Sequence, residues 1–172
     1  SDYAEYNKKT NLIKLENNVN ATDARGNNFI TKQALYNEKL KLFESFGETI
    51  ITTSGGSIIK TENVIFDNLK GVIFSNKETV ITDFQNNKII MDNFEYQINS
   101  NIFKSIGKIK ISDSLKNSYE FSQIYLNEKT KEIVGSDAKL FINQDDFKPN
   151  KGNKPRIFSN SINISNNKSK FI

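Results

Sequence analysis

Residues 33–36 read Gln33-Ala34-Leu35-Tyr36, a polar residue with apolar residues at the second and fourth positions, and this pattern returns every thirty residues. The later copies are Asn63-Val64-Ile65-Phe66, Asn93-Phe94-Glu95-Tyr96 and Gln123-Ile124-Tyr125-Leu126. Further apolar columns keep the same spacing: Tyr6, Tyr36, Phe66, Tyr96, Leu126; Ile13, Phe43, Ile73, Phe103, Ile133; and Phe29, Ile59, Ile89, Tyr119. A fixed period of this length indicates small units that bury their apolar faces by stacking on their neighbours.

Each unit has the composition of β-strands. Residues 48–53 and 57–66 are rich in Ile, Val, Phe and Thr, and Gly or Asn residues punctuate such segments. We expect about three strands per unit, with turns at residues 17–18, 46–47, 76–77 and 106–107, and at 26–27, 55–56, 86–87 and 116–117. Residues 112–133 could also form an amphipathic helix, but Tyr119, Ile124 and Leu126 keep the strand register, which favours strands.

Alternation along the strands predicts which side chains face inward, because successive residues of a strand point to opposite faces. Gln33, Asn63, Asn93 and Gln123 are expected to point outward. The predicted inward residues are Ala34, Tyr36, Val64, Phe66, Phe94, Tyr96, Ile124 and Leu126 on one strand of each unit, Ile13, Phe43, Ile73, Phe103 and Ile133 on the next, and Ala21, Ile51, Ile81 and Ile111 on a third. These three apolar stripes would line either a packed core or an open trough, and periodicity alone does not separate the two.

The composition of the chain excludes several classes of binding site and catalytic site. The chain has 172 residues, enough for one domain, and its net charge of +4 comes from interspersed charges that do not resemble a nucleic-acid stripe. It contains neither His nor Cys, which excludes the usual catalytic triads and thiolate or imidazole zinc sites. A β-helical polysaccharide lyase is disfavoured because no cluster of Asp, Arg and Lys recurs on one strand face. We therefore expect no enzyme activity, no metal and no cofactor.

Charged groups in the predicted loops are explained most simply by turn chemistry and solvation. Asp23, Asp83 and Asp113 fall at turns, where Asp hydrogen-bonds its own backbone, and Asp145-Asp146 is one pair in a polar segment. Lys148, Lys151, Lys154 and Arg156 are expected to form a solvated basic loop and not a nucleic-acid site. No apolar run reaches eighteen residues, and Ser1-Asp2-Tyr3 lacks a signal region, which fits either a cytosolic protein or a chain that begins after a processed leader.

The order of these elements resembles a known repeat. The segments Ala4-Glu5-Tyr6-Asn7, Leu12-Ile13-Lys14-Leu15, Asn17-Asn18-Val19, Asp23 and Gly26-Asn27-Asn28 are similar to the OstA-like repeat of lipopolysaccharide transport proteins, and the similarity runs from residue 4 to residue 142. It implies an antiparallel β-jellyroll of two facing, V-shaped sheets over residues 1–147. It also implies a periplasmic lipid-binding protein of Gram-negative envelope biogenesis, whose apolar trough shields the acyl chains of lipopolysaccharide as the lipid slides.

Residues 148–172 break the period and are expected to form a linker and a last strand. Asn153-Lys154-Pro155-Arg156 followed by a strand resembles the end of the periplasmic domain of LptD-type members, which precedes an outer-membrane barrel. The resemblance then implies attachment to the outer membrane, with signal peptide and barrel outside this chain, and a lipoprotein plug as a partner. Alternatives are a free periplasmic bridge of the LptA type and a solid β-solenoid stalk or adhesin. A second, LptA-like jellyroll is expected to dock end to end on the first strand, at Tyr3, Ala4 and Tyr6.

Overall fold

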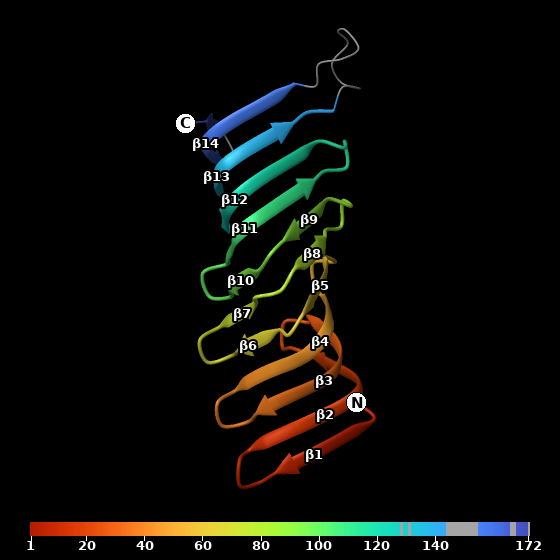
Figure 1. Cartoon of the computed structure of the whole chain (residues 1–172). Coiled ribbons are helices and arrows are strands. Elements are labelled where there is room, and N and C mark those ends of the chain that lie inside the picture. Colours follow the sequence, from red (N-terminus) through yellow and green to blue (C-terminus); the bar gives the residue numbers. More distant parts are fainter. Residues whose placement is uncertain (128, 131, 144–154, 166–167, 172) are drawn as a thin grey trace.

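The structure is a computed structural model that describes residues 1–127, 129–130, 132–143, 155–165 and 168–171. Within these residues the chain forms strands and turns and no helix. Its fifteen strands belong to one sheet with antiparallel pairing, and Figure 1 shows them stacked along one axis, from β1 at the bottom to β14 at the top. The predicted all-β, jellyroll-like fold is confirmed, and the helix considered for residues 112–133 is not formed.

The strands differ in length, and the shortest lie in the middle of the sheet. Their bounds are β1 (Tyr3–Asn7), β2 (Leu12–Thr22), β3 (Asn28–Asn37), β4 (Leu42–Thr52), β5 (Ile58–Glu62), β6 (Ile65–Asp67), β7 (Val72–Ser75), β8 (Thr79–Thr82), β9 (Lys88–Met91), β10 (Phe94–Gln97), β11 (Ile102–Ser112), β12 (Ser118–Asn127), β13 (Glu132–Phe141), β14 (Arg156–Ser165) and β15 (Lys168–Phe171). Residues 11–40 contain two strands, 41–70 three, 71–100 four and 101–130 two, because the central strands are interrupted where the others only bend.

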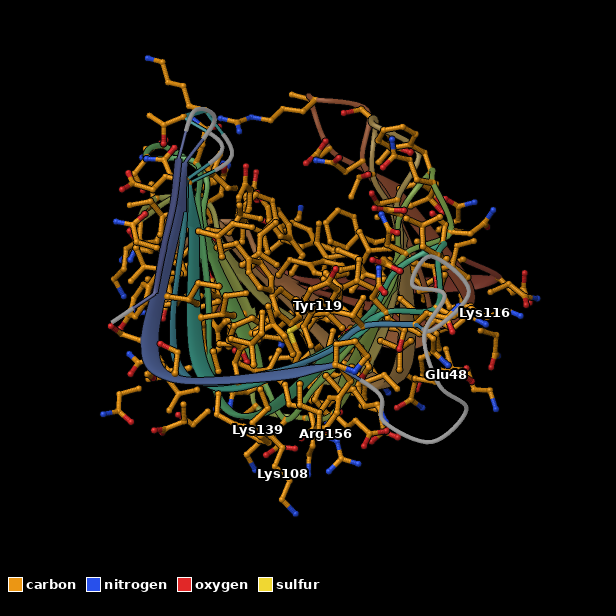
Figure 2. The ribbon with its side chains drawn as sticks, turned by 90° about the horizontal axis from the view of Figure 1, so that it is seen from above. Glu48, Lys108, Lys116, Tyr119, Lys139 and Arg156 are labelled. Carbon is orange, nitrogen blue, oxygen red and sulfur yellow. The ribbon has the colours of Figure 1, made fainter. Side chains whose placement is uncertain are left out.

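The bend divides the sheet into two arms. The first arm ends in the turns at residues 8–11, 38–41, 68–71, 98–101 and 129–130, and the second arm ends in the turns at 23–27, 53–57, 83–87 and 113–117. Seen along the stack in Figure 2, the arms form a V that is open between its two rims. Tyr119 points into the V, whereas Lys108, Lys139 and Arg156 lie on the outer face. The two arms therefore enclose an interior that runs the length of the stack.

Four predicted turns are instead points where the chain continues through the bend. Residues 17–18, 46–47 and 106–107 lie inside β2, β4 and β11, and residues 76–77 join β7 to β8 across the bend. The register shifts there, between Glu16 and Val19 and between Ile106 and Ile109, which is the mark of a β-bulge. Asn17, Gly47 and Gly107 have φ angles of 53°, 76° and 120°. Left-handed residues serve bulges as well as turns, so residue type did not separate the two.

The remaining turn predictions hold, and one set of turns was missed. Turns do occur at residues 26–27, 55–56, 86–87 and 116–117. The chain also reverses at residues 8–11, 38–41, 68–71 and 98–101, where the sequence analysis predicted no turn. One thirty-residue repeat is therefore one passage across both arms and back, which advances the chain by two strand positions along the stack.

This repeat places equivalent residues in direct register. On the first arm, each residue of one apolar ladder pairs with the next: Tyr6, Ile13, Tyr36, Phe43, Phe66, Ile73, Tyr96, Phe103, Leu126 and Ile133. On the second arm the corresponding ladder is Ala21, Phe29, Ile51, Ile59, Ile81, Ile89, Ile111, Tyr119, Leu140 and Ile157. Paired residues of antiparallel strands share a face, so each arm presents one continuous apolar stripe to the interior.

Candidate functional site

The candidate site is the trough between the two arms, and its narrow end is packed. Phe29 of the second arm lies 5.9 Å from Phe43 and 6.3 Å from Phe66 of the first arm, measured between ring centroids. Phe94 and Phe103 stack at 6.2 Å. Val64 and Met91 are fully buried in the same cluster. The arms are therefore held together along the bend by ordinary core packing.

Further from the bend the trough is hollow. One hollow of about 520 Å³ is lined by Ile13, Leu15, Ala21, Phe29, Tyr36, Phe43 and Phe66, with polar residues at its mouth. A second of about 670 Å³ is lined by Ile51, Ile59, Ile73, Ile81, Phe94, Tyr96 and Phe103, again with polar residues at its mouth. Both sizes fall in the range of small-molecule sites, about 300–1,000 Å³. The apolar walls and open mouths can hold extended hydrocarbon while a polar group stays in water.

The structure places all of the predicted inward residues on the concave side, at two depths. Ala34, Ile51, Val64, Ile73, Phe94 and Ile124 are buried. Ile13, Ala21, Tyr36, Phe43, Phe66, Ile81, Tyr96, Phe103, Ile111, Leu126 and Ile133 are partly exposed. Two of the three expected stripes pair with each other as the first-arm ladder, and the third belongs to the second arm. The deep residues serve the core, and the partly exposed ones form the accessible wall.

The second wall was predicted incompletely. Phe29, Ile59, Ile89 and Tyr119 share a thirty-residue column in the sequence, yet they were not assigned to the lining. Each pairs directly with an assigned residue, as Phe29 does with Ile51 and Ile59 with Ile81. The thirty-residue spacing of these four residues already indicated that they occupy equivalent positions. What was missing was the pairing that places this column beside Ala21, Ile51, Ile81 and Ile111.

Side-chain hydroxyls line the bend between residues 31 and 79. Thr31, Ser45, Thr49, Thr61, Ser75 and Thr79 are all buried there. The Ser45 and Thr49 hydroxyl oxygens lie 2.7 Å apart, and the Thr79 hydroxyl donates to Thr61 Oγ1 at 2.8 Å. No buried side-chain nitrogen or oxygen among the described residues lacks a hydrogen-bond partner. The hydroxyls therefore satisfy one another at a place where the strand ladder is interrupted.

The aspartates at positions 23, 83 and 113 build the rim of the second arm. The Asp23 carboxylate accepts hydrogen bonds from the backbone N–H groups of Arg25 and Asn27 and from the Asn27 side chain, at 2.8–2.9 Å. Asp83 and Asp113 repeat this set. The asparagine then reaches the following turn, since Asn27 Oδ1 accepts from Ser54 N at 3.0 Å and Asn87 Oδ1 from Ser114 N. The predicted turn role of these aspartates is confirmed.

One of these turns is also tied to the interior. The Tyr119 hydroxyl donates to Asp113 Oδ2 at 2.9 Å. Burial raises the pKa of Asp113, but hydrogen bonds from Asn117, Tyr119 and Leu115 outweigh it, so the pKa is lowered overall. Burial and then the bond to Asp113 raise the pKa of Tyr119. The side chain of Tyr119 therefore joins the apolar wall to the polar rim.

The first strand is an open edge, as predicted. β1 pairs with β2 alone, and all five of its residues are exposed, including Tyr3, Ala4 and Tyr6. The Tyr6 hydroxyl donates to Glu38 Oε2 at 3.0 Å, which holds the ring beside the next turn of the first arm. The free backbone groups of β1 can receive another strand, while docking of a partner remains a prediction.

At the opposite end of the stack the sheet continues after the break in the period. β14 pairs with β13, and Ile157 joins the second-arm ladder beside Leu140. Arg156 was expected in a basic loop, but it begins β14 and lies 5.8 Å from the centre of the Phe141 ring. The prediction of a loop at Arg156 is wrong, because Arg156 is the first residue of β14 and pairs with Phe141 of β13. Asp145, Asp146, Lys148, Lys151 and Lys154 lie outside the described residues.

A scan against protein-family models gives no match to this chain, and a search of curated proteins finds none either. The part of the chain that the structure describes contains no helix with the length and apolarity needed to span a membrane.

Proposed function

We propose that this protein carries the acyl chains of lipopolysaccharide through its trough, as a segment of the periplasmic route to the outer membrane. The observation that carries the proposal is the pair of in-register apolar ladders that leave open hollows of about 520 and 670 Å³ between them. A solid stalk would be expected to fill this space with side chains. The link to lipopolysaccharide rests on the OstA-like order of the repeats.

The physical advantage of such a trough is large for a lipid with several chains. Each CH₂ group removed from water contributes about 0.8 kcal/mol, so unprotected passage across the periplasm is prohibitive. Successive rungs of a ladder lie about 4.8 Å apart and carry similar side chains, here Ile, Phe and Tyr. A chain that shifts by one rung meets nearly the same surface, so no position traps it.

The ends of the stack support assembly into a longer conduit. β1 offers unpaired backbone groups to a strand of a second jellyroll, which would continue both ladders past Tyr6. Residues 153–156 followed by β14 favour the LptD type, with an outer-membrane barrel beyond this chain and a lipoprotein plug as partner. The LptA-type bridge is the alternative. Whether the gene encodes a barrel-like region after Ile172 distinguishes the two.

Site-specific photo-crosslinking tests the proposal. A photoreactive residue at Phe66 or Phe103, which line the two hollows, should capture lipopolysaccharide. The matched control is Lys60, which is exposed on the outer face of β5. Asn63 is less suitable as a control because its side chain accepts a hydrogen bond from Gly47 N at 2.8 Å and its φ is 52°. Equal labelling at Lys60 and Phe66 would rule out the trough as the binding surface.

A further inference from the structure

The turns at the rim of the first arm carry an unbalanced positive charge. Among the described residues of these turns there is one carboxylate, Glu38, whose Oε2 accepts the Tyr6 hydroxyl hydrogen bond. The lysines, called here the lysine rim, are Lys8, Lys9, Lys39, Lys41, Lys70 and Lys129. All six are exposed, and Lys70 alone forms an ion pair with a described residue, at 3.0 Å from Asp67. This edge of the trough is therefore cationic although the protein as a whole is nearly balanced.

The opposite rim carries Arg25 and Lys116 among the described residues, and Arg25 lies at the same mouth. Arg25, in the turn at residues 23–27, lines both hollows, while Lys41 lines the first and Lys129 the second. None of the three forms an ion pair with a described residue. Asp23 is the one carboxylate among the described residues that line the first hollow, and its oxygens already accept three hydrogen bonds from Arg25 and Asn27. The described residues that line the second hollow include no carboxylate.

Each hollow thus has an apolar interior and, at its mouth, uncompensated cations from both rims. Amide side chains stand beside these cations, Asn68 at the first hollow and Asn101 at the second, and can donate further hydrogen bonds. An ammonium and a guanidinium that line the same hollow attract an anionic headgroup to it. A headgroup without charge gains less from these two cations, because it accepts hydrogen bonds without the added charge attraction.

We propose that the mouth of the trough, formed by Arg25 with Lys41 and Lys129, binds the phosphate of a lipid whose chains occupy the hollows. This inference rests on the proposed function, since it assigns the headgroup of the lipid that the trough carries. The cations are exposed and act through solvent, so each contributes modestly, and their effect falls as salt increases. The lysine rim then offers successive phosphate positions along the stack.

Binding of two amphiphiles with the same chain separates headgroup from chain. Dodecyl phosphate and dodecyl maltoside are titrated into the protein below their micelle concentrations, by calorimetry at low ionic strength. The wild-type protein should bind the phosphate about three- to tenfold more tightly than the maltoside, and high salt should remove most of the difference. The triple variant R25Q/K41Q/K129Q should bind both alike, while the outer-face control K60Q/K110Q should keep the preference.

The outcomes distinguish the two proposals. If wild type binds both amphiphiles equally, the headgroup site is absent and the trough remains. If it binds neither, the trough itself does not take alkyl chains. Loss of the preference in K60Q/K110Q to the same extent would mean that net charge, and not the mouth, attracts the phosphate. Inorganic phosphate at the same concentration should leave dodecyl phosphate binding unchanged, and strong competition would indicate a site for the free ion.

Discussion

The bend of the sheet is built in two different ways along the stack, and the change falls between Thr79 and Met91. Between residues 31 and 79 it is lined by Thr31, Thr49, Thr61 and Thr79, whose hydroxyls bond one another and nearby backbone oxygens. From residue 91 onward the corresponding positions are Met91, Ile109, Phe121 and Ala138, packed as a hydrocarbon core. One backbone bend therefore accepts either hydrogen bonding or apolar packing.

The two parts of the bend are stabilised by different interactions. Threonines fix the bend through directional bonds and fill little volume, and the two hollows lie over this part and the centre of the stack. Met91 and Phe121 fill more volume, so the bend at the C-terminal end is held by dispersion and burial. Substitutions that exchange or remove these groups should separate the two mechanisms.

The largest effect is expected at the apolar end. Phe121 is 7% exposed and packs in the core cluster beside Ile124 and Ile162. Phe121→Ala should lower the free energy of unfolding by about 3–5 kcal/mol, because it leaves a cavity in a closed core. Urea unfolding measures this. Tyr125→Ala, at an outward site 39% exposed, is the matched control and should cost far less; equal losses would contradict the packing account.

A substitution at Gly135 tests the same packing by adding volume to the core instead of removing it. A Cβ atom at this position would lie 2.7 Å from Phe121 Cδ1 and 3.2 Å from Ile162 Cγ2. Gly135→Ala should therefore cost about 1–3 kcal/mol, as overpacked cores do. Combining it with Phe121→Leu should recover part of the loss in a double-mutant cycle. Strict additivity of the two changes would show that these residues do not compete for space.

In the part of the bend lined by hydroxyls, a substitution of threonine by valine removes the hydroxyl oxygen and keeps the shape of the side chain. Thr49 is fully buried and bonds to Ser45 and to Gly47 O. Thr49→Val should cost about 1–3 kcal/mol, because the buried partners lose a hydrogen bond. Ile109→Val, at the equivalent place sixty residues later, should cost about 0.5–1.5 kcal/mol. Were Thr49→Val neutral in chemical denaturation, the hydroxyl network would not stabilise the bend.

The smallest predicted effect concerns the rim of the second arm, where the turn at Asp113 differs from the turns at Asp23 and Asp83. Tyr119 forms a hydrogen bond with Asp113. The residues equivalent to Tyr119 in the repeats of Asp23 and Asp83 are Phe29 and Ile89, and neither side chain can form this bond. Because the pKa of Asp113 is lowered on folding, its contribution to stability is present above its unfolded pKa and is lost as pH falls through the folded value. Tyr119→Phe should raise the pKa of Asp113 towards its ordinary value in an NMR titration. An unchanged pKa would remove Tyr119 as a cause.

The sequence contained the period and the inward face, because alternation within a strand and repetition between strands specify the same residues. Ile13, Phe43 and Ile73 follow this rule directly. The bend could not be predicted from residue type, since Asn17 and Gly47 have the same left-handed preference in a bulge as in a turn. The buried threonines gave no sign of burial, because their partners come from other strands and the pairing is not visible in one segment. Ile157 was missed since residues 143–155 interrupt the spacing.

The most direct test of the trough uses the isoleucines that occur on both faces of the sheet. With methyl-labelled protein and dodecyl maltoside, nuclear Overhauser effects should connect the alkyl chain to Ile13, Ile59 and Ile81 on the inner ladders. Ile30, Ile58 and Ile106 are 44%, 42% and 56% exposed on the outer side and should show none. Contacts confined to the outer isoleucines, or an absence of contacts to the inner ones when the amphiphile binds, would contradict a lipid-carrying trough.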